Sequence, residues 1–183
     1  MPLDFSVLRY VGVIILEICQ TERLKIRRVE ESDSAFILKL LNEETFIKNI
    51  TDKNVRSHQD AIHYLRDGPI SDYTEFGFGQ YLVSLKDSDI PIGMCGFLKR
   101  DVFEYPDLGY AFLHEFWSKG YAREASVAVL NDGYKNHGLN IVVAGTSLDN
   151  RGSNNLLKKL GFSLKDRIEV YGKTCNLYEY SFM

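Results

Sequence analysis

The sequence predicts a single α/β domain with a central mixed, mostly antiparallel sheet flanked by helices. Its 183 residues suffice for one hydrophobic core and leave little for a second. A hydrophobic content of 45% and a charged content of 26% are typical of a globular protein. Segments with strand and helix periodicity alternate along the chain, and no repeat or low-complexity linker separates them. One mixed α/β unit is therefore expected.

Residues 1–15 are expected to be an N-terminal extension or an extra strand, ahead of a domain at residues 16–183. The most apolar run, residues 11–16, is far shorter than the ~20 residues that span a bilayer. Asp4 stands where a secretory signal carries positive charge, and no small-residue cleavage site follows. We therefore expect neither a membrane anchor nor a signal peptide.

A strand and two helices open the domain. Leu24 and Ile26 alternate with charged neighbours, which is the period of a half-buried strand. Ser32 or Asp33 can cap the first helix, and Ser57 can cap the second. The apolar stripes of the two helices are Phe36, Ile37, Leu40 and Leu41, followed by Ala61, Ile62 and Leu65.

Three further strands form a meander. Residues 80–85 and 92–98 are β-like, and the polar, proline-containing segment between them favours a turn. These two strands are expected to pair as an antiparallel hairpin. A third strand, residues 107–113, follows a charged segment that also contains proline.

The second half of the domain predicts a β-α-β crossover and a final hairpin. Residues 121–135 form a broadly apolar helix that Gly138 can terminate, and residues 141–144 read as a core strand. Asn150 suits the N-cap of another helix, which Gly161 ends. The tail predicts strands at residues 168–171 and 176–182.

The turn before the long helix carries the strongest functional signal. Gly120 precedes a helix start, where N–H groups lack intrahelical partners and the helix dipole is positive. A glycine also lets an anion approach the backbone closely. This turn predicts a phosphate or pyrophosphate site, with a plain turn as the alternative.

Two motifs give the chain a resemblance to the GNAT superfamily of N-acetyltransferases over about residues 16–183. The first is Trp117-Ser118-Lys119-Gly120-Tyr121-Ala122, followed by Glu124-Ala125. The second is Asn150-Arg151-Gly152-Ser153, with Leu160-Gly161-Phe162 at the expected spacing. Together they resemble the branch that contains ribosomal-protein N-terminal (alanine) acetyltransferases and small-amine acetyltransferases.

The resemblance implies a GNAT-like fold with splayed middle strands and acetyl-coenzyme A (acetyl-CoA) as co-substrate. It places the pyrophosphate at Trp117, Ser118, Lys119, Gly120, Tyr121 and Ala122. It also implies that backbone groups of Phe112 and Leu113 pair with pantetheine like an added strand. Asn150 would hydrogen-bond the pantetheine arm, and Ser153 would lie near the cofactor.

The implied reaction moves an acetyl group to a primary amine by direct attack, with help from a general base. Asp107 stands where this branch often carries an acidic residue, so it is the candidate base; Glu104 and His114 are alternatives. Many superfamily members have a tyrosine, acting as the general acid for the departing thiolate, where this chain has Leu157. Ser153 is therefore the catalytic candidate for assisting the thiolate, with unaided departure as the alternative.

The acceptor is expected to be a protein N-terminus or a small-molecule amine. The segments expected to shape its pocket, residues 42–56 and 68–79, read as loops. Their aromatic side chains either line that pocket, pack back onto the domain or form a dimer contact; they are Phe46, Tyr73, Phe76 and Phe78. A monomer and a homodimer both remain open.

Several other functions are disfavoured. A net charge of −3 gives no basic field for nucleic acid. The four histidines form no HExxH or similar ligand set, so no metal is expected. No phosphate loop of the GxxxxGK[ST] kind occurs. Three widely spaced cysteines match neither a disulfide framework nor a metal pair and favour a reducing cytoplasm.

One competing interpretation keeps the fold and removes the chemistry. The chain would then be a non-catalytic acyl-CoA-binding sensor module. Thiol release from acetyl-CoA in the presence of amines separates the two, because only an enzyme produces it.

Overall fold

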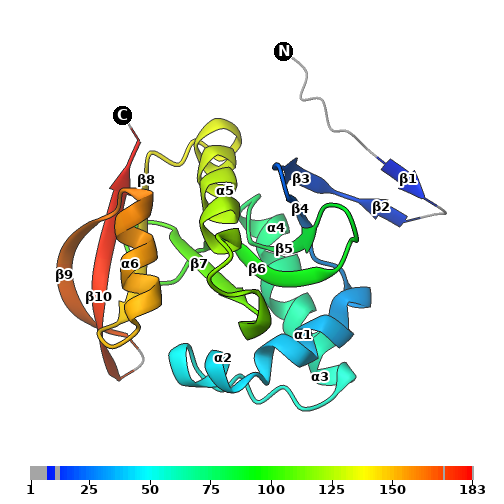
Figure 1. The fold of residues 1–183 in the computed structure, drawn as a ribbon, viewed down its shortest axis with the longest axis horizontal. Helices are drawn as coiled ribbons and strands as arrows, with labels where there is room; N and C mark the ends of the chain where they lie inside the picture. Colours follow the sequence, from blue (N-terminus) through cyan, green and yellow to red (C-terminus); the bar gives the residue numbers. More distant parts are fainter. Residues whose placement is uncertain (1–7, 11–12, 171, 183) are drawn as a thin grey trace.

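The fold is built on one eight-stranded sheet (Figure 1). The computed structural model describes residues 8–10, 13–170 and 172–182. The strand order is β3-β4-β5-β6-β7-β8-β10-β9, and β7–β8 is its one parallel pair within the described residues. A separate two-stranded sheet pairs β1 (Leu8–Tyr10) with β2 (Val13–Ile15).

The strands of the main sheet are β3 (Glu17–Gln20), β4 (Leu24–Arg28), β5 (Gln80–Leu85), β6 (Pro91–Leu98), β7 (Asp107–Phe112), β8 (Ile141–Ser147), β9 (Ser163–Val170) and β10 (Lys173–Ser181). The α-helices are α1 (Ser34–Leu41), α2 (Glu44–Asn49), α3 (His58–Leu65), α4 (Ser71–Glu75), α5 (Tyr121–His137) and α6 (Arg151–Leu160). Short helical turns lie at Glu31–Asp33, Arg66–Ile70 and His114–Phe116.

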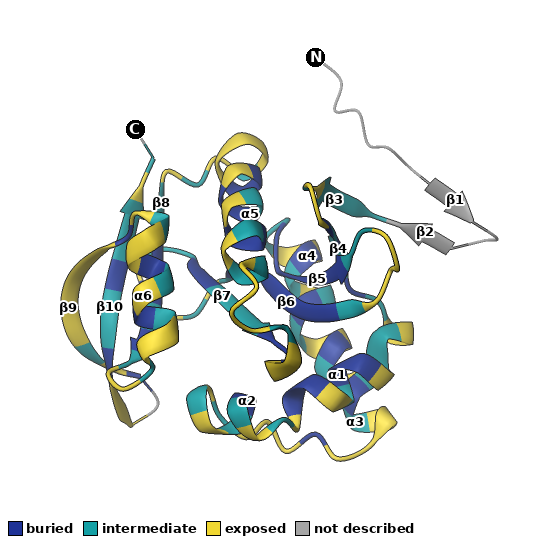
Figure 2. Ribbon diagram, viewed as in Figure 1, coloured by how far each residue is buried: buried dark blue, intermediate teal, exposed yellow. Residues whose placement is uncertain are grey.

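Helices cover both faces of the sheet. The long helix α5 packs across β3, β4, β6 and β7 and contacts α6, so these two helices share one face (Figure 1). Helices α1, α3 and α4 cover the opposite face of the β4–β7 half. Figure 2 shows that the strands between these layers are buried. The expected single α/β domain with a mostly antiparallel sheet is therefore confirmed.

The predicted caps explain several helix boundaries. The Ser57 side chain accepts a hydrogen bond from the N–H of Asp60 and forms a capping box at the start of α3. The side chain of Asn150 accepts one from the N–H of Ser153 at the start of α6. Gly138 ends α5 at φ 66°, a left-handed conformation that glycine adopts without steric strain.

The interpretation of residues 42–56 and 68–79 as loops was wrong in part. The first contains α2, which buries Phe46 but has no side-chain cap and no long apolar stripe. The second contains the end of the Arg66–Ile70 turn and all of α4. Gly68 has a non-helical backbone and is followed by Pro69, so the chain breaks here between two short helical segments. Glycine and proline are also typical of loops, which is why the sequence did not reveal these segments.

The aromatic side chains of these segments pack back onto the domain. Phe46, Tyr73 and Phe78 are buried in the main core, and Phe76 packs against it. The Tyr73 hydroxyl accepts a hydrogen bond from the N–H of Val29 and donates one to the carbonyl of Gln80. Tyr73 thereby ties α4 to two neighbouring strands.

Candidate active site

Two neighbouring parallel strands separate at the centre of the sheet. Strands β7 and β8 are paired only at Asp107 and Val143, close to the start of each strand. Beyond that point both strands continue, β7 to Phe112 and β8 to Ser147. The middle strands are therefore splayed, as expected, and the interval between them is called the opening.

The register of β7 shows which backbone groups face this opening. The Leu113 N–H donates to the carbonyl of Ile92 on the β6 side, at 2.9 Å. Because backbone groups of an antiparallel strand alternate in direction, those of Tyr110 and Phe112 point the other way, toward β8. The Leu113 carbonyl accepts from the N–H of Phe116. Both main-chain groups of Leu113 thus already have partners.

The turn that leads from β7 into α5 exposes backbone donors. Ser118 and Gly120 have φ angles of 60° and 83°, which bend the chain sharply into the helix. Gly120 is the N-cap of α5 and offers no side-chain cap. Within the described residues, the N–H groups of Tyr121, Ala122 and Arg123 have no hydrogen-bond acceptor. These N–H groups form an uncapped helix N-terminus that faces the solvent.

An arginine just before β4 holds this turn in place. The sequence did not predict its role. The Arg23 Nη1 donates to the carbonyl of Lys119 at 3.0 Å, and its guanidinium lies 4.6 Å from the ring centroid of Tyr121. Its Nε donates to Glu124 at 2.7 Å. Thr21 also donates to Glu124, at 2.6 Å. The only sequence signal was Glu124 in the first turn of a helix, and it does not name a distant partner.

Glu124 is held as a carboxylate. Burial by itself raises the pKa of Glu124. Hydrogen bonds from Thr21 and Arg23, together with the charge of Arg23, lower the pKa by more, so it lies below its usual value. A negative charge in the first helical turn also interacts favourably with the dipole of α5. Glu124 and Arg23 therefore fix the turn without filling its free N–H groups.

Trp117 closes the start of the turn. Its indole Nε1–H donates to the carbonyl of Phe112 at 2.8 Å, and its ring meets His114 edge to face. The Lys119 ammonium lies 5.1 Å from the ring centroid of Phe116. His114 itself is exposed, so its side chain lies at the surface of the turn.

Helix α6 brings polar groups to the other side of the opening. The Asn150 side-chain oxygen caps the helix, while its amide nitrogen has no protein partner among the described residues. The Ser153 hydroxyl lies 2.8 Å from the Tyr110 hydroxyl of β7. Buried Asn154 accepts a hydrogen bond from Tyr178 on β10, at 2.8 Å. The helix is thereby anchored to the sheet.

Asp107 lies where β7 and β8 meet, on the sheet face away from α5. Its side chain is 2% exposed, and both oxygens accept from Arg100, at 3.0 and 2.5 Å. Burial raises the pKa of Asp107, and the hydrogen bonds and charge of Arg100 only partly oppose that. Leu157 is buried in the core, and Glu104 is exposed on the loop before β7.

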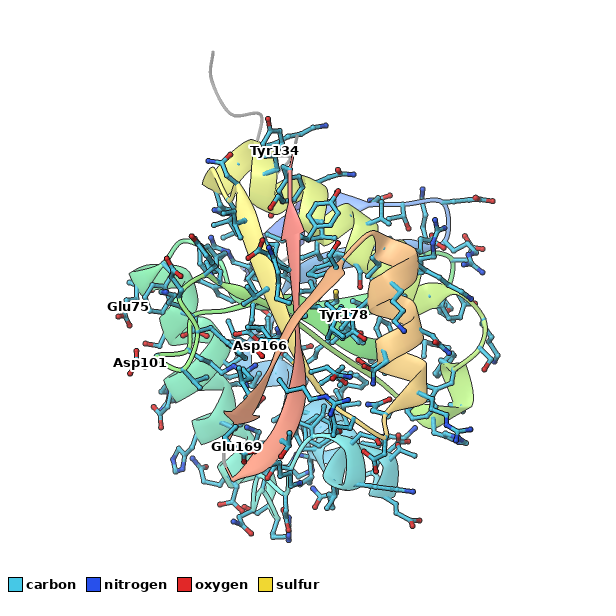
Figure 3. The ribbon with its side chains drawn as sticks, turned by 90° about the vertical axis from the view of Figure 1, so that its left-hand side faces the viewer. Glu75, Asp101, Tyr134, Asp166, Glu169 and Tyr178 are labelled. Atoms are coloured by element: carbon cyan, nitrogen blue, oxygen red, sulfur yellow. The ribbon has the colours of Figure 1, made fainter. Side chains whose placement is uncertain are left out.

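A cavity of about 350 Å³ adjoins Val143 on the same face as Asp107. Apolar side chains form its wall and three glutamates stand around it; these are Phe103, Val143 and Leu177, with Glu104, Glu169 and Glu179. Glu179 pairs with Lys165 at 2.9 Å, and Glu169 accepts from the Thr174 hydroxyl. Glu169 lies at the lower edge of β9 (Figure 3).

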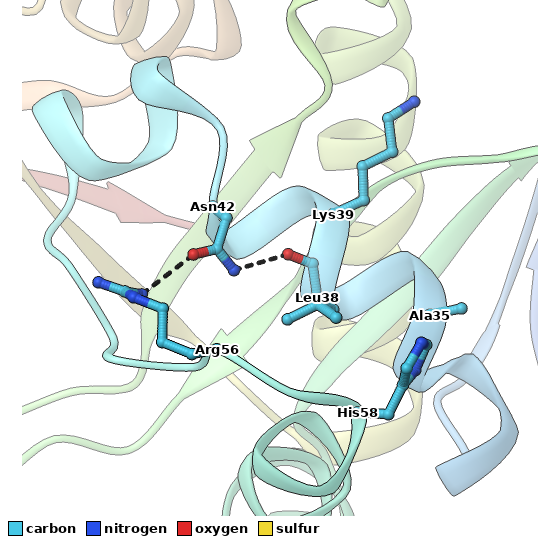
Figure 4. A pocket seen from close by; sticks show the side chains of 6 residues that line it. All are labelled: Ala35, Leu38, Lys39, Asn42, Arg56 and His58. Atoms are coloured by element: carbon cyan, nitrogen blue, oxygen red, sulfur yellow. Dashed lines mark hydrogen bonds between the residues drawn. The ribbon is translucent and has the colours of Figure 1, made fainter.

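A second cavity lies on the surface of α1, away from these groups (Figure 4). It is a shallow, open depression of about 450 Å³, lined by Ala35, Leu38, Lys39, Asn42, Arg56 and His58. Arg56 pairs with Asp52 and donates to Asn42, and Lys39 pairs with Glu115. Its lining includes none of the predicted catalytic or cofactor-binding residues, although Asn42 and Arg56 belong to the segment expected to shape the acceptor pocket. Lys39 and Arg56 are already paired with carboxylates.

A family model described as an acetyltransferase (GNAT) domain matches residues 23–163. The chain belongs to the GNAT acetyltransferase family. It is 27% identical over 176 residues to the uncharacterized N-acetyltransferase p20 of Bacillus licheniformis, with 92% of this chain and 97% of that protein covered. GNAT enzymes are N-acetyltransferases that typically use acetyl-CoA as co-substrate.

Solved structures share the GNAT fold. The ribosomal-protein-S5-alanine acetyltransferase from Vibrio fischeri aligns with a TM-score of 0.76 at 18% identity, covering 89% of this chain and 95% of that one. RimL, a ribosomal L7/L12 α-N-protein acetyltransferase in complex with coenzyme A, aligns with a TM-score of 0.77 at 18% identity, covering 90% and 97%. The resemblance drawn from the two motifs is therefore confirmed at the level of family and fold.

The described residues contain no helix long and apolar enough to cross a membrane. Among the same residues, no group of three or more histidine, cysteine or acidic side chains is arranged to hold a metal ion.

Proposed function

We propose that this GNAT enzyme transfers an acetyl group from acetyl-CoA to a primary amine by direct attack. One observation carries the proposal: the opening between β7 and β8 leads to a glycine turn with three free N–H groups at the start of α5. An extended chain ending in a pyrophosphate matches both parts, because strand-like pairing suits the opening and an anion suits the helix N-terminus.

The residues present fit such a ligand. The N–H groups of Tyr121 and Ala122 would bind the pyrophosphate, with Lys119 adding positive charge at the rim. The backbone of Tyr110 and the N–H of Phe112 face the opening, so these groups, in place of those of Leu113, would pair with pantetheine; the Phe112 carbonyl already accepts from Trp117. The free amide nitrogen of Asn150 would donate to the same arm from the opposite side.

Acetyl-CoA supplies the thioester: the amine nitrogen bonds to its carbonyl carbon, the C–S bond breaks, and the electron pair leaves on sulfur. Asp107 is the proposed acceptor of the amine proton, because burial raises its pKa and it lies where the strands meet. Both carboxylate oxygens are bonded to Arg100, so this transfer runs through a water molecule. Ser153 is the proposed hydrogen-bond donor to the departing sulfur.

The acceptor is proposed to enter from the face opposite α5 and α6. The cavity beside Val143 lies on that face and carries the carboxylates of Glu104 and Glu169, whose negative charge favours a protonated amine. A protein N-terminus, with a reference pKa of ~7.7–8.0, needs less deprotonation than a lysine at ~10.4. An N-terminal peptide or a similarly acidic small amine is therefore the proposed acceptor class.

The test is thiol release from acetyl-CoA with a panel of ribosomal-protein N-terminal peptides, polyamines, aminoglycosides and amino acids. We expect amine-dependent release with at least one member of the panel, and weaker use of that amine by a Glu104→Gln, Glu169→Gln double variant. Acetyl-CoA binding without release by any amine would instead support the non-catalytic sensor.

A further inference from the structure

Tyr110 and Ser153 form a hydrogen-bonded hydroxyl pair that joins the two sides of the opening. Tyr110 belongs to β7, and Ser153 belongs to the helix that follows β8. Their oxygen atoms are 2.8 Å apart, and the Tyr110 oxygen is 3.5 Å from the Ser153 carbonyl. The β7–β8 pairing lies three residues before Tyr110, at Asp107, so this contact crosses the part where the strands have separated.

Either hydroxyl of this pair can donate to the other. Burial raises the pKa of Tyr110, and the bond to Ser153 only partly opposes this, so the phenol keeps its proton. The half-buried phenol has two acceptors within reach, and the Ser153 hydroxyl oxygen is the nearer of the two. With Tyr110 as the donor, Ser153 accepts with one lone pair.

The proton of Ser153 is left free by this arrangement. Among the described residues, the Ser153 hydroxyl makes no hydrogen bond besides the one with Tyr110, and the Asn150 carbonyl one turn before it is taken by the backbone and side-chain N–H groups of Asn154. Its backbone N–H is fixed by the side chain of Asn150 at 3.1 Å. Both the helix cap and the phenol thus orient the Ser153 hydroxyl, with its proton available to a group in the opening.

We propose that Tyr110 is a positioning residue that orients Ser153 to donate a hydrogen bond to the departing sulfur. The inference rests on the proposed acetyl transfer. When the C–S bond breaks, the sulfur takes the electron pair and accepts this hydrogen bond, while the proton stays on Ser153. The thiolate, which is far less basic than an alkoxide, takes its proton from solvent. Tyr110 acts only through Ser153 and does not itself contact the reacting atoms.

The test is a double-mutant cycle of Tyr110→Phe and Ser153→Ala on the acetyl-transfer rate. Ser153→Ala is expected to lower kcat about 10- to 100-fold, because it removes a donor to developing charge. Tyr110→Phe is expected to lower kcat about tenfold, with little change in KM for the amine. If Tyr110 acts through Ser153, the double variant will be no slower than Ser153→Ala alone.

Tyr178→Phe is the matched control. It also removes a buried hydroxyl that bonds α6, but its partner is Asn154 and its strand is β10; Tyr178 is labelled in Figure 3. The fold loss of kcat in a Tyr178→Phe, Ser153→Ala double variant is expected to be the product of the losses in the two single variants. Multiplying effects of Tyr110→Phe and Ser153→Ala, or an unchanged kcat in Tyr110→Phe, would overturn the inference. Absence of amine-dependent thiol release in the wild type would instead overturn the proposed function.

Discussion

The glycine at the start of α5 gives a prediction whose size follows from its backbone. Gly120 has a φ of 83°, and a side chain in this left-handed region costs roughly 1–2 kcal/mol. The added Cβ of Gly120→Ala would lie 3.3 Å from Nη2 of Arg23, the end of a flexible side chain that can move. Backbone strain, rather than a clash, therefore dominates the effect.

This strain is expected to appear in coenzyme A affinity. The turn is exposed, so it can relax in the free protein, and ligand binding must then restore the strained form. A difference of roughly 1–2 kcal/mol corresponds to about 5- to 30-fold weaker binding. Trp117 is the only tryptophan of the chain and lies in this turn, so its fluorescence can report a coenzyme A titration.

Gly138→Ala is the matched control for this prediction. Gly138 ends the same helix at a φ of 66°, and nothing lies within 4 Å of its added Cβ. The strain at Gly138 should be of similar size but should appear in the free protein, where a loss of ~1 kcal/mol lowers Tm by about 2–4 °C in a chain of this size. Only Gly120→Ala should lose affinity. Wild-type affinity in Gly120→Ala, or an equal loss in Gly138→Ala, would refute the assignment of the turn.

Three further predictions concern other parts of the site. The pKa of Glu124 is lowered in the fold, so its stabilisation is present above the ordinary value of 4.5 and lost as pH falls through the folded pKa. Glu124→Gln should thus lower Tm at pH 7 and flatten the fall of Tm below about pH 4.5. An unchanged profile of Tm against pH would argue against a stabilising ion pair between Glu124 and Arg23. Asp107→Asn should lower kcat about 100-fold or more with coenzyme A affinity unchanged, whereas full activity across pH would leave Asp107 as the partner of Arg100 alone. Coenzyme A should change the emission of Trp117, and no change at saturation measured by calorimetry would place the ligand elsewhere.

Local sequence signals predicted most of the fold because their causes are local. Ser57, Asn150 and Gly138 set helix ends through caps within a few residues, and the structure shows each of them. The crossover from β7 through α5 to β8 followed from the order of segments. The short helices α2 and α4 were not predicted, because neither has a capping side chain or an apolar stripe long enough to show helical periodicity.

The parts of the site that sequence did not predict depend on long-range contacts. Arg23 lies about a hundred residues before Glu124, and only the fold brings the two together. The pairing of Tyr110 with Ser153 likewise joins residues 43 positions apart. The main-chain direction of Leu113 depends on its register with β6, which no residue type specifies. The motifs thus predicted the candidate residues, whereas the fold determines their partners.

The most direct test of acetyl transfer uses acetyl-CoA labelled with deuterium in its acetyl group, together with the best amine from the thiol-release screen. Mass spectrometry should find the label on the amine nitrogen, in equal amount to the released thiol, with no label retained on the protein. Thiol release without a labelled amine, or a labelled protein that forms before the product, would contradict direct transfer to an amine.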